Sequence, residues 1–164
     1  MFSIHPCPLP SGALLARYSG GGAYADCYAV DIPGAVTHAQ YVTAFYTTAV
    51  FKLERFILKW AVSRPSTDAQ AGQLATGAIG DFAAWHVEKR SDNQLLLTDF
   101  RGRTRSWLMV APLGAGGGTR LYFGSAVIPA RHGETGAPTP GLVFRALLGF
   151  HRAYSEILLY AAKS

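Results

Sequence analysis

Residues 82–128 read FAAWHVEKR, SDN, QLLLTDF, RGR, TRSWLMVA, PLGAGGG and TRLYFGSAVI in succession, which is four β-prone runs separated by turn sequences. The runs are Phe82–Arg90, Gln94–Phe100, Thr104–Ala111 and Thr119–Ile128. Short polar or glycine-rich connections join antiparallel neighbours, because a parallel pair needs a crossover of about a dozen residues or more. This part of the chain therefore predicts an antiparallel sheet with a meander topology.

A strand and a long helix are predicted before these runs. The apolar run Ala23–Ile32 ends at a Pro-Gly turn and is typical of a strand, and Leu14–Tyr18 is a further candidate strand. Thr37 and Gln40 form a capping box, in which each side chain bonds the backbone N–H of the other residue. Apolar residues then recur at three- and four-residue steps, so a helix is predicted over Thr37–Val62.

Two more helices are predicted, one before the four runs and one after them. Thr67 and Gln70 repeat the capping-box pattern and predict a short helix over Asp68–Ala75. A loop rich in glycine and proline, Ala130–Pro138, follows the last strand. It leads to a C-terminal helix predicted over Pro140–Ala162, with proline at its first position and an apolar stripe along one side.

The composition is that of a single folded domain. Of the 164 residues, 49% are hydrophobic and 15% are charged, which is enough apolar material for one core. We therefore predict one α+β domain over residues 1–164, irregular over residues 1–22, with Trp60 and Phe150 buried. The formal charge of +5 is spread along the chain. Because nucleic-acid-binding proteins cluster their basic residues, no nucleic-acid partner is expected.

The cysteines and the hydrophobic segments bear on three further classes of protein, namely metal- or cofactor-binding, secreted and membrane-spanning proteins. Cys7 and Cys27 lie outside any CxxC or histidine spacing, so no metal or cofactor is expected, and free thiols in the cytoplasm are the default. No secretory signal is visible. The segment Tyr41–Val62 contains four charged residues, each costing about 2.5–3.5 kcal/mol near a bilayer centre. No transmembrane segment is therefore expected, and the oligomeric state stays open.

The order strand, long helix, short helix, antiparallel strands and long C-terminal helix resembles the START-like, or Bet v 1-like, helix-grip (SRPBCC) superfamily. Three segments are similar in sequence to a bacterial group of that superfamily: Ala23–Tyr28 (AYADCY), Asp99–Trp107 (DFRGRTRSW) and Phe150–Ser155 (FHRAYS). The resemblance implies an antiparallel sheet wrapped around the long C-terminal helix, with a cavity for lipids, polyketides or hormones between them. Some relatives are cyclases or hydrolases. Members of this superfamily usually have seven strands, whereas this sequence shows only five clear ones.

The strand pairing predicts which polar residues share a sheet face. Turns at Asp92-Asn93 and Gly102-Arg103 would set His86 opposite Asp99 and Asp99 opposite Ser106. One face would carry His86, Glu88, Asp99, Arg101, Thr104, Ser106 and Tyr122. The other would carry the core residues Trp85, Val87, Leu96, Phe100, Trp107, Met109, Leu121 and Phe123.

This polar face has two readings. His86 and Asp99 could form an oriented acid–base pair, with Arg101 available for an anionic group. Alternatively, the face is the solvated side of the sheet, with ordinary cross-strand charge pairs. The second reading is the more common one for an antiparallel sheet.

The helices contribute three more candidates. His151 falls on or beside the inward stripe of the C-terminal helix, where it would contact a ligand, act in catalysis or simply be a hydrogen-bonded core residue. Tyr46 and Tyr154 are candidate cavity hydroxyls, although tyrosines in a core stripe usually pack with the hydroxyl satisfied. With Arg101 and Tyr122, these three residues form the predicted ligand-binding set, whereas His86, Asp99 and His151 are the catalytic candidates.

The function predicted from these features is the binding of a small, mainly apolar molecule in an internal cavity between the sheet and the C-terminal helix. Two alternatives stay open. One is a cyclase- or hydrolase-type enzyme of the same fold. The other is a protein-interaction module whose interior is filled by aromatic side chains.

Overall fold

The computed structural model describes residues 4–19, 24–47, 67–82, 85–99 and 102–128, together with Phe150 and Ala153. Its secondary structure over these ranges is, in order, β1 (His5–Pro6), the 3₁₀ helix η1 (Leu14–Tyr18), β2 (Tyr24–Ile32), α1 (His38–Tyr46), α3 (Asp68–Thr76), β3 (Asp81–Phe82), β4 (Trp85–Ser91), β5 (Gln94–Asp99), β6 (Thr104–Pro112) and β7 (Thr119–Val127).

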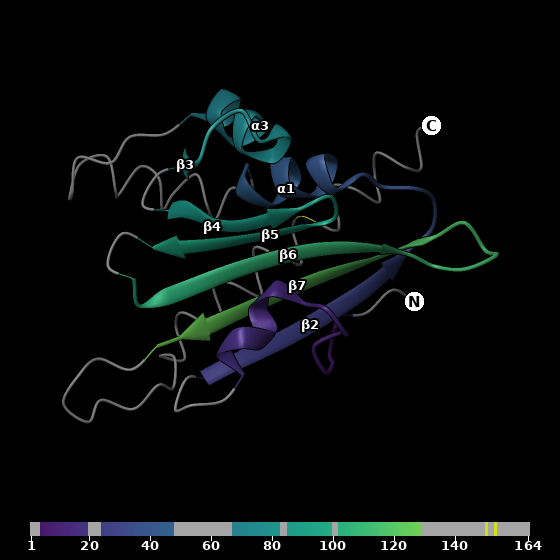
Figure 1. Cartoon of the computed structure of the whole chain (residues 1–164). Coiled ribbons are helices and arrows are strands. Elements are labelled where there is room, and N and C mark those ends of the chain that lie inside the picture. The colour runs from purple at the N-terminus through teal and green to yellow at the C-terminus, as the bar shows by residue number, and fades with distance from the viewer. Residues whose placement is uncertain are drawn as a thin grey trace.

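The seven described strands form one antiparallel sheet in the order β1-β2-β7-β6-β5-β4-β3 (Figure 1). Strands β4 to β7 follow one another across the sheet, so the meander predicted from the turn sequences is confirmed. Strand β2 pairs with β7 and places the N-terminal part of the chain at the opposite edge from β3. The α+β class is likewise confirmed.

Helices α1 and α3 begin where their capping boxes predict. The hydroxyls of Thr37 and Thr67 accept from the N–H groups of Gln40 and Gln70, and both glutamine side chains accept from the cap N–H groups in return. Two orphan donors are thus satisfied at each helix start. The helix predicted over Thr37–Val62 ends earlier than expected, because Tyr46 is the last residue of α1 and Thr47 is its C-cap. The residues predicted to be helical beyond Thr47 lie outside the described residues. So does most of the predicted C-terminal helix.

Both faces of the sheet are covered. On the helix face, α1, α3 and Phe150 pack on the strands, through the sheet residues Val30, Ile32, Leu95, Leu97, Leu108, Val110, Leu121 and Phe123. On the η1 face, Leu15 packs on a second cluster that contains Cys27, Leu96, Trp107, Met109 and Ala126. The prediction that the core residues share one face of the sheet, and that the other face is polar, is therefore wrong. Because Leu95, Leu96 and Leu97 follow one another in β5, that strand is apolar on both sides and needs cover on both.

Within residues 4–19, the N-terminal segment contains β1 and η1 and packs on the η1 face. The Gln94 side chain holds it, because Oε1 accepts from the Leu14 N–H (2.8 Å) and Nε2 donates to the Gly12 carbonyl (3.1 Å). Leu14–Tyr18 is a 3₁₀ helix and not the candidate strand, since its N–H groups bond back to carbonyls three residues earlier. The sequence predicted five clear strands, whereas the sheet in the described residues has seven, because it also includes the short strands β1 and β3.

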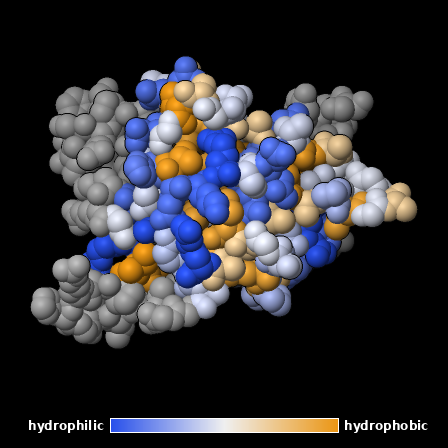
Figure 2. All heavy atoms as spheres, in the orientation of Figure 1, coloured by the Kyte–Doolittle hydropathy of each residue, from blue (hydrophilic) through white to orange (hydrophobic). Residues whose placement is uncertain are grey.

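Figure 2 shows the η1 face as a mixture of hydrophilic and hydrophobic residues, with hydrophilic ones crossing its middle. No helix within the described ranges is long and apolar enough to cross a bilayer.

Candidate functional site

The predicted pair of His86 and Asp99 does not form. A β-bulge at Glu88 shifts the register between β4 and β5 by one residue, so that His86 lies opposite Thr98 and Asp99 lies opposite Trp85. The turn at Asp92-Asn93 is as predicted, because Ser91 pairs with Gln94; the error arises only beyond the bulge. A shift of one residue moves a side chain to the other face of a sheet.

Each member of the predicted pair has a local partner instead. His86 lies near the Asp81 carboxylate on β3 (Nδ1 to Oδ1, 3.2 Å), and their side chains are 57% and 86% exposed. Asp99 accepts from the N–H groups of Arg103 (2.8 Å) and Thr104 (3.1 Å), which stabilises the β5–β6 turn. Neither arrangement encloses a substrate, so the described structure does not support an acid–base pair at these residues.

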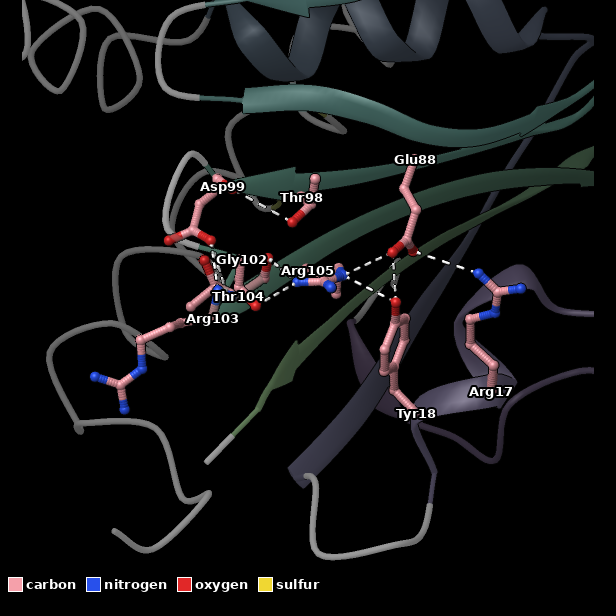
Figure 3. Close-up of polar contacts among 9 residues, drawn as sticks. All are labelled: Arg17, Tyr18, Glu88, Thr98, Asp99, Gly102, Arg103, Thr104 and Arg105. Atoms are coloured by element: carbon pink, nitrogen blue, oxygen red, sulfur yellow. Dashed lines mark hydrogen bonds and ion pairs between the residues drawn. The ribbon is translucent and has the colours of Figure 1, made fainter. Parts of the chain in front are cut away.

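The bulge turns Glu88 onto the η1 face, where it joins a compact charge cluster (Figure 3). Its Oε1 accepts from the Tyr18 hydroxyl (2.5 Å) and from Arg105 Nε (3.2 Å). Arg105 also lies over the Tyr18 ring at 4.8 Å, and Arg17 approaches Glu88 Oε2 at 3.8 Å. The Arg105 side chain is only 11% exposed. These contacts tie η1 to the sheet, which is a structural role.

Two of the predicted ligand-binding tyrosines, Tyr122 and Tyr46, are described, and they lie on opposite faces of the sheet. Tyr122 is opposite Met109 in the β6–β7 pair and packs its ring on Trp107 (5.9 Å between centroids), so it belongs to the η1 face and not beside Ser106. Tyr46 is buried on the helix face, where its hydroxyl lies 3.0 Å from the Ser106 hydroxyl. Arg101, His151 and Tyr154 lie outside the described residues.

A row of polar side chains crosses the helix face and ends at Tyr46. Asp26 on β2 is opposite Ser125 on β7, and Ser125 is opposite Ser106 on β6. Directly opposite residues in antiparallel strands share a face. Asp26 Oδ1 accepts from both the Ser125 hydroxyl (2.7 Å) and the Ser125 N–H (3.0 Å). We call Asp26, Ser125, Ser106 and Tyr46 the polar row.

The Asp26 carboxyl is the titratable member of the polar row. Burial raises its pKa above the usual value, and the two hydrogen bonds from Ser125 offset this only in part. Both bonds end on Oδ1, so Oδ2 is the oxygen left to carry a proton or to meet a ligand. A carboxyl that keeps its proton more readily can donate as well as accept.

The surroundings of the polar row are aromatic. Phe123 lies two residues before Ser125 on β7, on the same face of the sheet. Its ring stacks on that of Phe45 in α1, with 5.3 Å between ring centroids and 25° between ring planes. Tyr46 meets Phe45 and Phe82 edge to face at 5.1 and 5.6 Å. The result is an apolar layer with a few convergent polar groups, which is the usual make-up of a small-molecule site.

A pocket of about 500 Å³ opens where β1 ends and leaves the edge of β2 uncovered. It is lined by Pro6, Cys7, Pro8, Leu9, Ser19, Ala25, Asp26, Cys27 and Tyr28. Asp26 therefore belongs both to this pocket and to the polar row. Within the described ranges, no three His, Cys, Asp or Glu residues group as metal ligands would.

The sequence reading found Tyr46 and Ser106 but missed Asp26 and Ser125. One signal was present for Asp26: it alternates with Tyr28, Val30 and Ile32, so it is a carboxylate on the side of β2 that otherwise carries core residues. Nothing local marks Ser125, because its role comes from pairing across strands.

Comparison with known proteins adds no assignment, since no family model, curated protein or solved structure matches this chain.

Proposed function

We propose that the protein binds a small, mainly apolar molecule that carries at least one hydrogen-bonding group, and that the molecule lies against the helix face of the sheet. The observation that carries this proposal is the polar row within the aromatic layer. Ser106 and Tyr46 are buried there and Asp26 and Ser125 are half-buried, and burying a polar side chain costs free energy unless its hydrogen bonds are made. A ligand-binding role gives a reason for keeping them.

A helix-grip arrangement of the C-terminal part belongs to the same proposal. Phe150 is fully buried and its ring lies 5.7 Å from Phe123 and 6.3 Å from Tyr41. Ala153, three residues later, is buried in the same cluster. Spacing of three residues suits one side of a helix that packs on the sheet. Such a helix would form the wall opposite the polar row.

The polar row can serve a ligand in two ways. Hydroxyls rotate, so the Tyr46 and Ser106 pair can redirect a donor or acceptor toward a ligand oxygen at little cost. Protonated Asp26 can donate from Oδ2 to a carbonyl while Oδ1 keeps its bonds to Ser125. The apolar remainder of the ligand would replace contacts among the aromatic rings.

The test begins with native mass spectrometry of freshly purified protein, followed by binding of fatty acids, aromatic polyketides and steroids. Tyr46→Phe and Ser106→Ala should weaken binding of the molecule found roughly 5- to 10-fold, as expected for one hydrogen bond of about 1 kcal/mol or slightly more. Tyr122→Phe is the matched control, because it removes a tyrosine hydroxyl on the opposite face. Equal loss in the control would contradict the proposed location.

A second candidate is the protein-interaction module. It is favoured by the direct packing of Phe45, Phe123 and Phe150 on one another, which leaves the described part of the interior occupied by side chains. If no molecule co-purifies and none of the three ligand classes binds, this candidate replaces the first. The enzyme alternative is not favoured, because His86 and Asp99 do not pair and the contact that His86 makes instead, with Asp81, is exposed.

A further inference from the structure

Two thiols meet at the pocket on the edge of β2. In the β1–β2 pair, Pro6 lies opposite Tyr28, so the next residue, Cys7, comes opposite Cys27. The Cys7 N–H donates to the Cys27 carbonyl (3.0 Å), which continues the strand pairing by one residue. The two Sγ atoms are 3.3 Å apart, and both cysteines are free thiols.

This geometry is close to that of a disulfide. Directly opposite residues in antiparallel strands have Cα atoms roughly 4.5–5.5 Å apart, within the range of about 4.4–6.8 Å found across disulfides. The Sγ atoms need to approach from 3.3 Å to about 2.05 Å, a movement that side-chain rotation can supply. The backbone pairing can therefore remain intact in both redox states.

The two thiols differ in access. Cys7 is partly exposed, whereas Cys27 is 5% exposed and packs in the η1-face cluster. Burial, together with the hydrogen bond to Cys7, raises the pKa of the Cys27 thiol well above its usual value. Because thiolates are the attacking species, Cys7 is the residue suited to react first with a molecule from solution.

The pocket has room for that molecule. Both cysteines line its volume of about 500 Å³, which lies within the range of roughly 300–1,000 Å³ typical of small-molecule sites. Pro6, Pro8, Leu9 and Ala25 provide an apolar rim. A low-molecular-weight disulfide fits this combination of two adjacent thiols and a small open pocket.

We propose that Cys7 and Cys27 form a redox-active dithiol site that undergoes thiol–disulfide exchange with low-molecular-weight disulfides of the type RSSR. Cys7 sulfur, after loss of its proton, attacks one sulfur of RSSR; the S–S bond breaks, and RS⁻ leaves and takes up that proton. Cys27 then loses its proton and attacks the Cys7 sulfur, and the second RS⁻ leaves as RSH. The cysteines are oxidised by two electrons and RSSR is reduced to two thiols.

Oxidation would fasten the N-terminal strand to the sheet. Strand β1 has only two residues, and Cys7 is 20 positions before Cys27. Closing a loop of that length stabilises a folded domain, and for a chain of this size the expected rise in Tm is roughly 5–10 °C. The dithiol state leaves β1 held by hydrogen bonds and packing alone.

The test uses the full chain equilibrated with oxidised and reduced glutathione at a series of ratios, followed by acid quenching and mass spectrometry under non-reducing conditions. The expected product is the intact monomer that has lost two hydrogens, with a peptide in which Cys7 is linked to Cys27. Cys27→Ala should stop at one glutathione attached to Cys7. Cys7→Ala should react at least 10-fold more slowly, because Cys27 is buried.

Three results would overturn the proposal. They are a disulfide that forms only in denaturant, a product that links two chains, and a Cys7→Ala variant that reacts as fast as the Cys27→Ala variant. Circular dichroism of both variants shows whether they fold. If one does not, Cys→Ser at the same position replaces it, and the wild-type product alone still decides between an internal disulfide and the other outcomes.

Discussion

At the scale of single residues, Glu88 shows how one extra residue redirects a side chain. As the unpaired residue of the β4–β5 bulge, it leaves the ladder between Val87 and Lys89. Its carboxylate then reaches Arg105 and Tyr18 on the η1 face. Without the bulge, the register set by the Asp92-Asn93 turn would put Glu88 opposite the buried Leu97, so the bulge keeps this carboxylate out of the helix-face core and gives it an ion pair.

Removing Arg105 should be costly for that reason. Arg105→Ala leaves a mostly buried carboxylate with only a distant cation, and breaking buried pairs in this way costs on the order of 3–5 kcal/mol. The free energy of unfolding in urea measures the loss. Arg17→Ala is the control, because its side chain is 52% exposed and its 3.8 Å ion pair should contribute less than about 1 kcal/mol. Similar losses for both variants would contradict a buried role for Arg105.

Asp26 should make stability depend on pH in an unusual direction for a carboxyl. Its pKa in the folded protein lies above the unfolded value of 3.8. Its contribution to stability is therefore complete below pH 3.8 and is lost as the pH rises through the folded-state pKa. Asp26→Asn cannot ionise, so its stability relative to wild type should increase from about pH 4 to pH 7, measured by urea unfolding at each pH.

Asp31 on the same strand provides a control of opposite sign. Its hydrogen bonds with Arg120 (2.6 and 2.8 Å) lower the pKa of its carboxyl. That contribution is present above the unfolded pKa and is lost as the pH falls. Asp31→Asn should therefore be less stable than wild type at neutral pH, and the difference should shrink in acid. Parallel pH profiles for the two variants would refute the account of Asp26.

At the scale of elements, η1 packs closely on β7 because Gly124 has no side chain. A Cβ added there would meet Leu15 Cδ2 at 2.6 Å and both Trp107 Cε3 and the Asp26 carbonyl at 2.8 Å. Contacts of that length force either η1 or the strand to move. Gly124 therefore sets how near the N-terminal segment lies to the sheet.

We expect Gly124→Ala to destabilise the protein by about 1–3 kcal/mol through overpacking. Gly72→Ala is the matched control, because Gly72 lies inside α3 and an added Cβ meets nothing within 4 Å. Alanine there should stabilise by roughly 0.5–1 kcal/mol, as glycine is a poor helix residue. Thermal and urea unfolding of the two variants measure both changes in stability. An unchanged stability of Gly124→Ala would show that η1 packs more loosely than described.

The starts of the two described helices and the β4–β5 turn were the most predictable part of the fold. The capping boxes at Thr37 and Thr67 and the turn at Asp92-Asn93 all act within a few residues, so the sequence pattern contains the whole cause. Leu14–Tyr18 was the exception. Whether that segment becomes a strand or a 3₁₀ helix depends on distant partners, among them Gln94.

At the scale of the whole molecule, the two-sided sheet needs cover from segments far apart in the chain. Phe150 provides cover on the helix face, where it is fully buried against Tyr41 and Phe123. Phe150→Ala should cost on the order of 3–5 kcal/mol in unfolding free energy, through lost burial and the cavity left behind.

The control for Phe150→Ala is Leu113→Ala, a half-buried position in the β6–β7 loop, which should cost less than about 1 kcal/mol. A loss below about 1 kcal/mol for Phe150→Ala itself would mean that the C-terminal part does not pack on the sheet as described. The companion prediction that Trp60 is buried falls outside the described residues and stays a prediction.

Within the described residues, the sequence by itself determined the α+β class, the order of β2, α1, α3 and the strands β4 to β7, and the starts of both helices, because periodicity, capping and turn chemistry are local. Only the tertiary structure decided which side chains meet. The bulge at Glu88 separated His86 from Asp99, and strand pairing brought Asp26 to Ser125 from 99 residues away. Register is set by the packing of both sheet faces at once, so a one-residue change that is small locally moves every later side chain to the other face.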